Sequence, residues 1–143
     1  MKDTIIPDNN HVARYCKPTT VENNEILATA FLMKPIDESL SVNWLEYLKL
    51  PTREKEISKI QDVYNKKLNV SSKSKIVVVN VGLARKKVSV ESDDRRNLLF
   101  KHDPSKEDPS HSGIFNLKPD DEMIAELILS VVDQEHHVYP AKK

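Results

Sequence analysis

The sequence predicts a small α+β domain in which a mixed β-sheet is covered by two main amphipathic helices. Three segments carry this prediction. Apolar residues recur at helical spacing over 52–68, the run 76–81 is rich in β-branched residues, and 119–122 has the composition of a helix start. The order of the elements along the chain favours a sheet whose main covers are residues 52–68 and 119–135.

The first helix is predicted to begin at Thr52, a residue type that accepts a hydrogen bond from the first turn. Apolar residues then follow at steps of three and four, with lysine and glutamate at many positions between them. These apolar residues are Ile57, Ile60, Tyr64 and Leu68. Their spacing predicts one buried stripe on an otherwise solvated helix.

Before this helix, the sequence predicts two strands and a short helix. Residues 11–15 and 26–33 are expected to be strands joined as a hairpin, since turn-forming residues lie between them. In the block 40–48, Asn43 stands three residues before Glu46, which is the spacing of a helix capping box. We therefore expect a short helix in that block.

After the first helix, the β-branched run 76–81 predicts a central strand covered on both faces. The pattern of 83–91 is ambiguous, and we favour a short helix over a strand. Residues 97–102 and 112–117 are predicted strands, and the proline-containing segment 103–110 is a predicted loop.

The last predicted helix begins near Pro119, which is followed by three acidic residues that suit a helix N-terminus. Its buried stripe is Ile124, Leu127, Ile128, Val131 and Val132. His136 and His137 are expected in its last turn, where the helix dipole favours a proton.

The chain has 143 residues, 38% of them apolar and 31% charged, which is typical of one compact domain. We expect a flexible arm at 1–10, one α+β domain at 11–137 and a C-terminal tail at 138–143. The N-terminus lacks the apolar core of a signal peptide, and no apolar stretch approaches the roughly 20 residues of a membrane span. These features predict a cytoplasmic protein without a membrane partner.

Composition also excludes several kinds of site. The 22 basic and 22 acidic residues balance, so the whole chain exerts no strong attraction on nucleic acid. Cys16 is the only cysteine, and two glycines are too few for a glycine-rich phosphate loop. The histidines and acids follow no metal-ligand spacing, so we expect neither a metal nor another cofactor.

Four residues are the candidates for catalysis. Arg14 carries a guanidinium that suits an anionic group, and Glu46 is a candidate acid or base. His102 and His111 are candidate general bases near neutral pH. In this hypothesis Arg14 holds a nucleotide phosphate, and the polar block around Ser41 and Asn43 holds a sugar.

Five residues are candidates for binding. Trp44 is the only tryptophan, and Ser112 stands beside a glycine in a segment whose backbone amides can meet a ligand. The other three form a basic cluster within the basic region 73–101, namely Arg85, Lys86 and Lys87. Basic clusters of this kind contact phosphates, although the nearby acids make a solvated surface the favoured interpretation.

The function predicted first is a non-catalytic protein-interaction or accessory and regulatory protein, whose partner is another protein. One alternative is a small enzyme that acts on a nucleotide or nucleic acid through an Arg/His pocket. A second alternative is an RNA-binding module that uses region 73–101. An enzyme should gather Arg14 and the histidines in one concave pocket, whereas an adaptor should show an exposed apolar patch and scattered histidines. The oligomeric state stays open.

Overall fold

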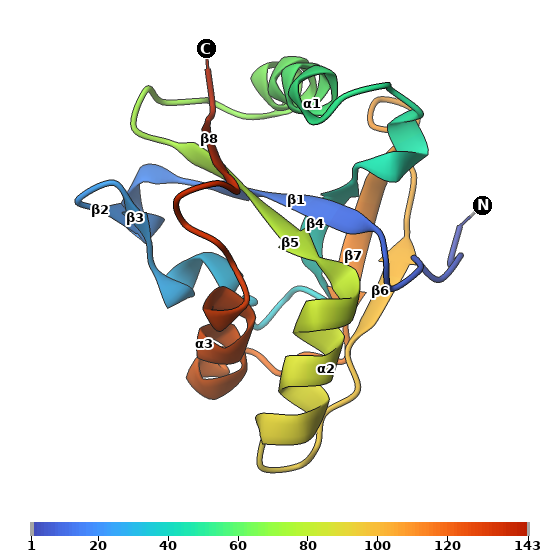
Figure 1. The fold of residues 1–143 in the computed structure, drawn as a ribbon, viewed down its shortest axis with the longest axis vertical. Coiled ribbons are helices and arrows are strands. Elements are labelled where there is room, and N and C mark those ends of the chain that lie inside the picture. The colour runs from blue at the N-terminus through green and yellow to red at the C-terminus, as the bar shows by residue number, and fades with distance from the viewer. Residues whose placement is uncertain (1, 143) are drawn as a thin grey trace.

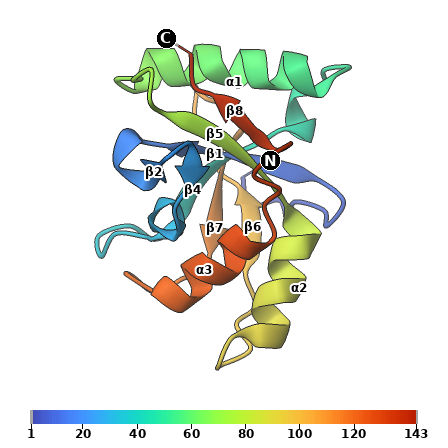
Figure 2. The same cartoon turned by 60° about the vertical axis from the view of Figure 1, so that its left-hand side comes forward.

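A computed structural model describes residues 2–142 as three layers (Figures 1 and 2). Helix α1 (Arg53–Lys67) covers one face of a six-stranded sheet. Helices α2 (Val81–Glu91) and α3 (Glu122–Ser130) lie on the opposite face. The predicted α+β fold is confirmed, and a third helix shares the covering that the sequence assigned mainly to two.

The sheet has the strand order β6-β7-β4-β1-β5-β8, and all of its pairs are antiparallel. The prediction of a mixed sheet is therefore wrong. Strands β4 and β5 run in the same direction, but β1 lies between them, so they form no parallel pair. The six strands are β1 (His11–Cys16), β4 (Leu40–Trp44), β5 (Lys75–Asn80), β6 (Leu99–His102), β7 (His111–Phe115) and β8 (Val138–Pro140).

The three helices begin where side-chain caps satisfy their first amides. The Oγ1 atom of Thr52 accepts from the Lys55 amide at 3.2 Å, as the sequence predicts for α1. Asn80 caps α2 by accepting from Leu83 at 2.8 Å, which settles the ambiguous segment 83–91 as a helix. Asp121 caps α3.

The predicted strand at 26–33 is wrong beyond its first residue. A two-residue strand, β3 (Glu25–Ile26), pairs only with β2 (Val21–Glu22), and a 3-10 helix, η2 (Ala28–Phe31), follows. The Gln134 side chain bonds both the amide and the carbonyl of Ile26, at 2.7 and 3.1 Å, and so occupies the backbone groups that a longer strand would pair. The predicted hairpin with β1 is absent, because β1 pairs with β4 and β5.

The predicted helix at 40–48 is also wrong. Leu40–Trp44 form β4, and only a 3-10 turn, η3 (Glu46–Leu48), follows it. Asn43 caps no helix, because its buried amide donates to the Asp108 carboxylate at 2.8 Å. A tertiary contact therefore overrides the local capping pattern.

The C-terminal segment differs from the prediction in two places. Helix α3 ends at Ser130, so His136 and His137 lie beyond it, in a turn where Asp133 accepts from the His136 amide and ring. Residues Val138–Pro140, inside the segment predicted as a tail, form β8 on the edge of the sheet beside β5. An edge position tolerates a proline because one side of the strand has no ladder partner.

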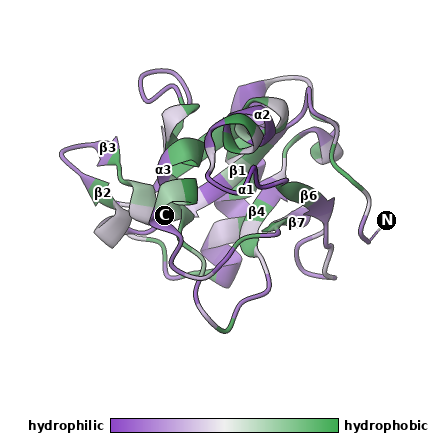
Figure 3. Ribbon diagram, turned by 90° about the horizontal axis from the view of Figure 1, so that it is seen from below, coloured by the Kyte–Doolittle hydropathy of each residue, from purple (hydrophilic) through white to green (hydrophobic). Residues whose placement is uncertain are grey.

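The sheet divides the buried apolar residues into two clusters. The larger cluster lies between the sheet and α2 and α3, and includes Phe31, Phe100, Ile114 and Ile128. Figure 3 shows hydrophobic stretches on both of these helices. The smaller cluster lies under α1 and includes Ile60. None of the helices in residues 2–142 is long and apolar enough to cross a membrane.

The segment 2–10, for which the sequence predicts a flexible arm, lies along the outer edge of β6. The Ile6 amide donates to Phe100 at 2.9 Å, and the His102 amide donates to Thr4 at 2.9 Å. The Ile6 side chain is fully buried in the larger cluster. The segment therefore covers a sheet edge that would otherwise expose backbone groups.

Candidate functional site

The candidate site forms where β1 and β4 separate. Strand β1 pairs with β5 along its whole length, but it pairs with β4 only through Val12 and Ala13. Beyond these residues, the Arg14 side chain crosses the gap. Its Nη1 atom donates to the Ser41 carbonyl at 2.8 Å, and its Nε atom donates to the Ala30 carbonyl at 2.9 Å. A guanidinium therefore replaces the missing ladder bonds.

A pocket of about 470 Å³ opens at this gap. Its walls come from β1, β4, η2, the last turn of α1 and the start of β7. The charged side chains in the lining are mostly cationic: Arg14, Lys17, Lys34 and Lys67, with the single carboxylate Asp37. The pocket therefore carries an excess of positive charge in a chain whose overall charge is balanced.

Arg14 is the most deeply placed of these cations. Burial lowers the pKa of its guanidinium, and this effect outweighs the opposing influence of nearby groups that include Asp37. Its two hydrogen-bond acceptors are neutral carbonyls, and among residues 2–142 no carboxylate lies within 4.0 Å of it. A bound anion would supply the missing countercharge to the guanidinium. Its hydrogen bonds would also replace those that burial denies to water.

A buried polar network forms the floor of the pocket. Tyr64 donates from its hydroxyl to the Asn43 Oδ1 atom at 3.0 Å, and Asn43 donates to the Asp108 carboxylate. The second oxygen of Asp108 accepts from the Lys67 Nζ atom at 2.7 Å. Asp108 is fully buried, so the Lys67 ammonium compensates its charge. The network fixes α1 against β4 and the loop before β7.

His111 lies at the pocket rim with a defined pattern of hydrogen bonds. Its Nδ1 atom is 2.9 Å from the Asp103 carbonyl, and its Nε2 atom is 3.2 Å from the Ser41 hydroxyl. Strand pairing places these groups, since Asn43 faces His111 and Ser41 faces Gly113 across β4 and β7.

Gly113 provides space for the side chain of Ser39. The sequence suggests backbone freedom as its role, but its φ angle is not in the left-handed region. A Cβ atom at this position would lie 2.6 Å from the Ser39 hydroxyl, closer than real Cβ contacts allow. The absence of a side chain therefore lets Ser39, another lining residue, pack against β7.

The structure brings Arg14 and His111 into one pocket but places the other two catalytic candidates elsewhere. Glu46 bonds the backbone amide and the ring of His11, with its Oε2 atom 2.6 Å from Nδ1. His102 is fully buried, its ring centroid 5.3 Å from that of Trp44 and 4.5 Å from that of Tyr47. Both residues hold structural positions outside the pocket lining.

The binding candidates Trp44 and Ser112 are also held by internal contacts. The Trp44 indole donates to the Asn10 side chain at 2.8 Å, and the buried Ser112 hydroxyl donates to the Ser110 carbonyl at 3.1 Å. These bonds satisfy both polar groups inside the protein. Cys16 is buried as well, and burial raises the pKa of its thiol to about 12, which disfavours the nucleophilic thiolate.

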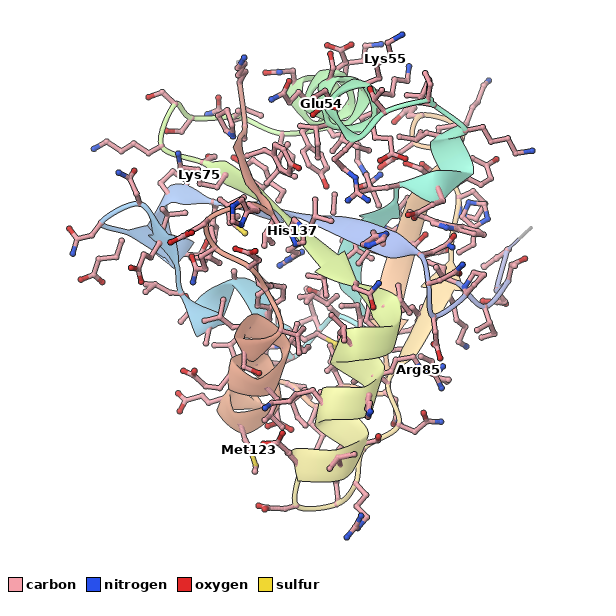
Figure 4. All side chains as sticks on the ribbon, in the orientation of Figure 1. Glu54, Lys55, Lys75, Arg85, Met123 and His137 are labelled. Atoms are coloured by element: carbon pink, nitrogen blue, oxygen red, sulfur yellow. The ribbon has the colours of Figure 1, made fainter. Side chains whose placement is uncertain are left out.

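The basic candidates lie on α2, away from the pocket. Arg85 bonds the Leu98 carbonyl, Asp8 and Asn97, and Lys87 pairs with Glu91, whereas Lys86 is exposed. Figure 4 shows Lys75 at the start of β5 and Arg85 well apart from it, beside α2. Region 73–101 therefore spreads its cations over separate parts of the surface.

Several pocket residues are absent from the candidates that the sequence suggests. Lys17, Lys34 and Lys67 carry no motif, and Tyr64 fits a helix core position. Their common feature is a place in the lining beside the β1–β4 gap, which local pattern does not reveal. Within residues 2–142 no cluster of three or more His, Cys, Asp or Glu is placed to hold a metal ion.

Comparison with known proteins gives no relative: no protein-family model, curated protein or solved structure matches the chain.

Proposed function

We propose that the protein binds a small anionic molecule, bearing a phosphate and of nucleotide size, in the pocket at the β1–β4 gap. The observation that carries this proposal is the lining charge: Arg14, Lys17 and Lys34 stand against the single carboxylate Asp37, in addition to Lys67, which is paired with Asp108. Arg14 contributes most, because it is placed without a contacting carboxylate and keeps donor capacity that a phosphate can use.

The size and chemistry of the pocket support the same ligand class. A volume of about 470 Å³ lies within the range of about 300–1,000 Å³ that small-molecule sites occupy. Hydroxyl groups of Thr29 and Ser39 in the lining can bond sugar or phosphate oxygens, whereas the Thr20 hydroxyl already donates to the Lys17 carbonyl at 2.7 Å. The amide of Asn43 is committed to the floor network, so Ser41 is the better partner for a sugar of the two that the sequence suggests.

The test is a titration of the labelled protein with adenosine monophosphate and with pyrophosphate, followed by two-dimensional NMR. We expect shifts that converge on Arg14, Ser41 and His111. Replacing Lys17 and Lys34 together by alanine should weaken binding at least tenfold, because a hydrogen bond to a charged group contributes about 1.5–3 kcal/mol.

The matched control replaces Lys86 and Lys87 by alanine, which removes the same charge from α2 and should leave the affinity unchanged. Equal weakening in both double variants would show that only overall charge matters. Failure of the wild-type protein to bind either anion at millimolar concentration would overturn the proposal.

An interaction protein, the function predicted first from the sequence, is favoured by a different surface. Leu83 and Val90 on α2 are 55% and 59% exposed, and with Val131 they border a hollow of about 210 Å³. Exposed apolar side chains of this kind occur at partner contacts. This hollow is smaller than the pocket at the β1–β4 gap, and its lining selects no partner chemistry. It therefore supports an interaction function less strongly than the pocket supports anion binding.

A further inference from the structure

The bonds of His111 determine which ring nitrogen carries the proton. The Asp103 carbonyl can only accept a hydrogen bond, so the Nδ1 atom, 2.9 Å away, must be the donor. In the neutral ring, Nε2 is then an unprotonated acceptor. The Ser41 hydroxyl, 3.2 Å from Nε2, donates to it. A serine hydroxyl therefore points its proton at a base that is able to take it.

This arrangement has the three parts of an activated nucleophile: a hydroxyl, a base within reach, and a group that orients the base. The orienting group is Asp103, whose carbonyl accepts from Nδ1 and whose carboxylate lies 3.9 Å from the same atom. The His111 side chain is 19% exposed and is anchored on β7, next to β4, which carries Ser41.

The pair also faces the pocket. Ser41 and His111 both belong to its lining, and Arg14 bonds the Ser41 carbonyl. Ser41 is exposed at this point, so a ligand can reach its hydroxyl. An anionic group held by the pocket cations would therefore place the rest of the ligand against the hydroxyl.

We propose that the pocket is an esterase site, in which Ser41 is the nucleophile and His111 the general base for a carboxylic ester that carries an anionic group. This inference rests on the proposed anion site. The Ser41 oxygen bonds to the acyl carbon and its proton passes to Nε2. The bond from the acyl carbon to the leaving oxygen then breaks, and that oxygen takes the proton from Nε2. Water repeats the sequence on the acyl-serine and releases the acid and free Ser41.

The first experiment uses a neutral alkyl fluorophosphonate, which phosphonylates an activated serine with loss of fluoride. Intact-protein mass spectrometry should show one label on the wild-type protein and none on the S41A variant. S58A removes an exposed hydroxyl on α1, outside the pocket lining, and should keep the label. The H111Q variant should react about 10²–10⁴-fold more slowly, the range that general base catalysis supplies, and should lose the pH dependence of the wild-type rate.

The second experiment compares p-nitrophenyl acetate with mono-p-nitrophenyl succinate. Wild-type protein should cleave the anionic ester at least tenfold more efficiently, and the K17A/K34A variant should lose that preference. S41A should cleave neither ester above the rate in buffer.

The outcomes separate this inference from the anion site itself. Binding of adenosine monophosphate without labelling of Ser41 would overturn the esterase and leave the anion site in place. Labelling of Ser41 without anion binding would instead overturn the anion site and, with it, the substrate class. Equal labelling of wild type and S41A would show reaction elsewhere and also overturn the esterase. Circular dichroism of each variant establishes that it is folded. Because Ser41 is exposed, S41A is the variant expected to disturb folding least.

Discussion

The two faces of the sheet are built in different ways. On the face covered by α2 and α3, large apolar side chains such as Phe31, Phe100 and Ile128 fill the interior. On the face covered by α1, a smaller apolar cluster shares the interior with the polar network of Asn43 and Asp108. The pocket opens beside this network, at the last turn of α1.

The two faces differ in what they contribute to the protein. Burial of apolar surface is a general source of stability, whereas a buried polar group lowers stability unless all its hydrogen bonds are made. Asp108 avoids that penalty through its bonds to Asn43 and Lys67. We infer that the α2/α3 face supplies most of the stability and that the polar network of the α1 face forms the floor of the pocket, which Arg14 enters from the side of Ala30, a member of the larger cluster.

The largest expected effect tests the apolar face. Phe100→Ala should lower the free energy of unfolding by about 3–5 kcal/mol, because it empties a site that is 1% exposed. The folded variant should keep its affinity for adenosine monophosphate, since Phe100 does not line the pocket. Urea denaturation measures the first quantity and NMR titration the second.

Leu83→Ala is the matched control, because this apolar side chain is 55% exposed and its loss should change stability by no more than about 0.5 kcal/mol. A loss below about 1 kcal/mol for Phe100→Ala would show that the α2/α3 face is loosely packed and would remove the contrast between the faces.

A second prediction tests the polar network. Lys67→Met keeps the length of the side chain but leaves the buried Asp108 carboxylate without its cation, and should lower the free energy of unfolding by about 2–3 kcal/mol. This range allows for screening by solvent, since Lys67 is 34% exposed. Adding Asp108→Asn should recover part of the loss, because the carboxylate is then gone.

Equilibrium denaturation of the two single variants and the double variant gives the coupling between the two sites. If the two single effects simply add, the pair contributes no specific interaction, and the network is a set of independent contacts.

The sequence predicts best the regions whose contacts join residues that are close together in the chain. Helix α1 and strand β5 depend on local periodicity and β-branched composition, and both are predicted close to their observed bounds. The short helix expected at Asn43 is wrong because a residue 65 positions away, Asp108, takes the side chain. Local propensity gives way wherever a buried partner competes.

The pocket is likewise built from contacts between residues that are far apart in the sequence. Residue types alone single out Arg14 and His111, and the structure places both in it. Their roles depend on Ser41, which is 27 residues from the first and 70 from the second. The separation of β1 from β4 and the lysines around it have no local signal. Glu46 and His102 have the same suggestive chemistry, yet tertiary packing gives them structural positions.

The smallest expected effect concerns Glu46, which contacts His11 at the opposite end of β1 from the pocket. Burial tends to raise the pKa of this carboxyl, but the hydrogen bonds from the His11 ring and amide outweigh it, so the pKa is lowered. The folded state then binds this proton less readily than the unfolded chain does. The resulting stability is present above the unfolded pKa of about 4.3 and is lost as pH falls through the folded value.

Glu46→Gln keeps an oxygen that can accept from the His11 amide but does not titrate. Its free energy of unfolding should therefore fall less steeply than that of wild type below about pH 5, as urea denaturation between pH 3 and 7 measures. Glu54→Gln, an exposed change on α1 (Figure 4), should leave the wild-type slope intact. If Glu46→Gln also keeps that slope, the His11 contact contributes nothing to stability in acid.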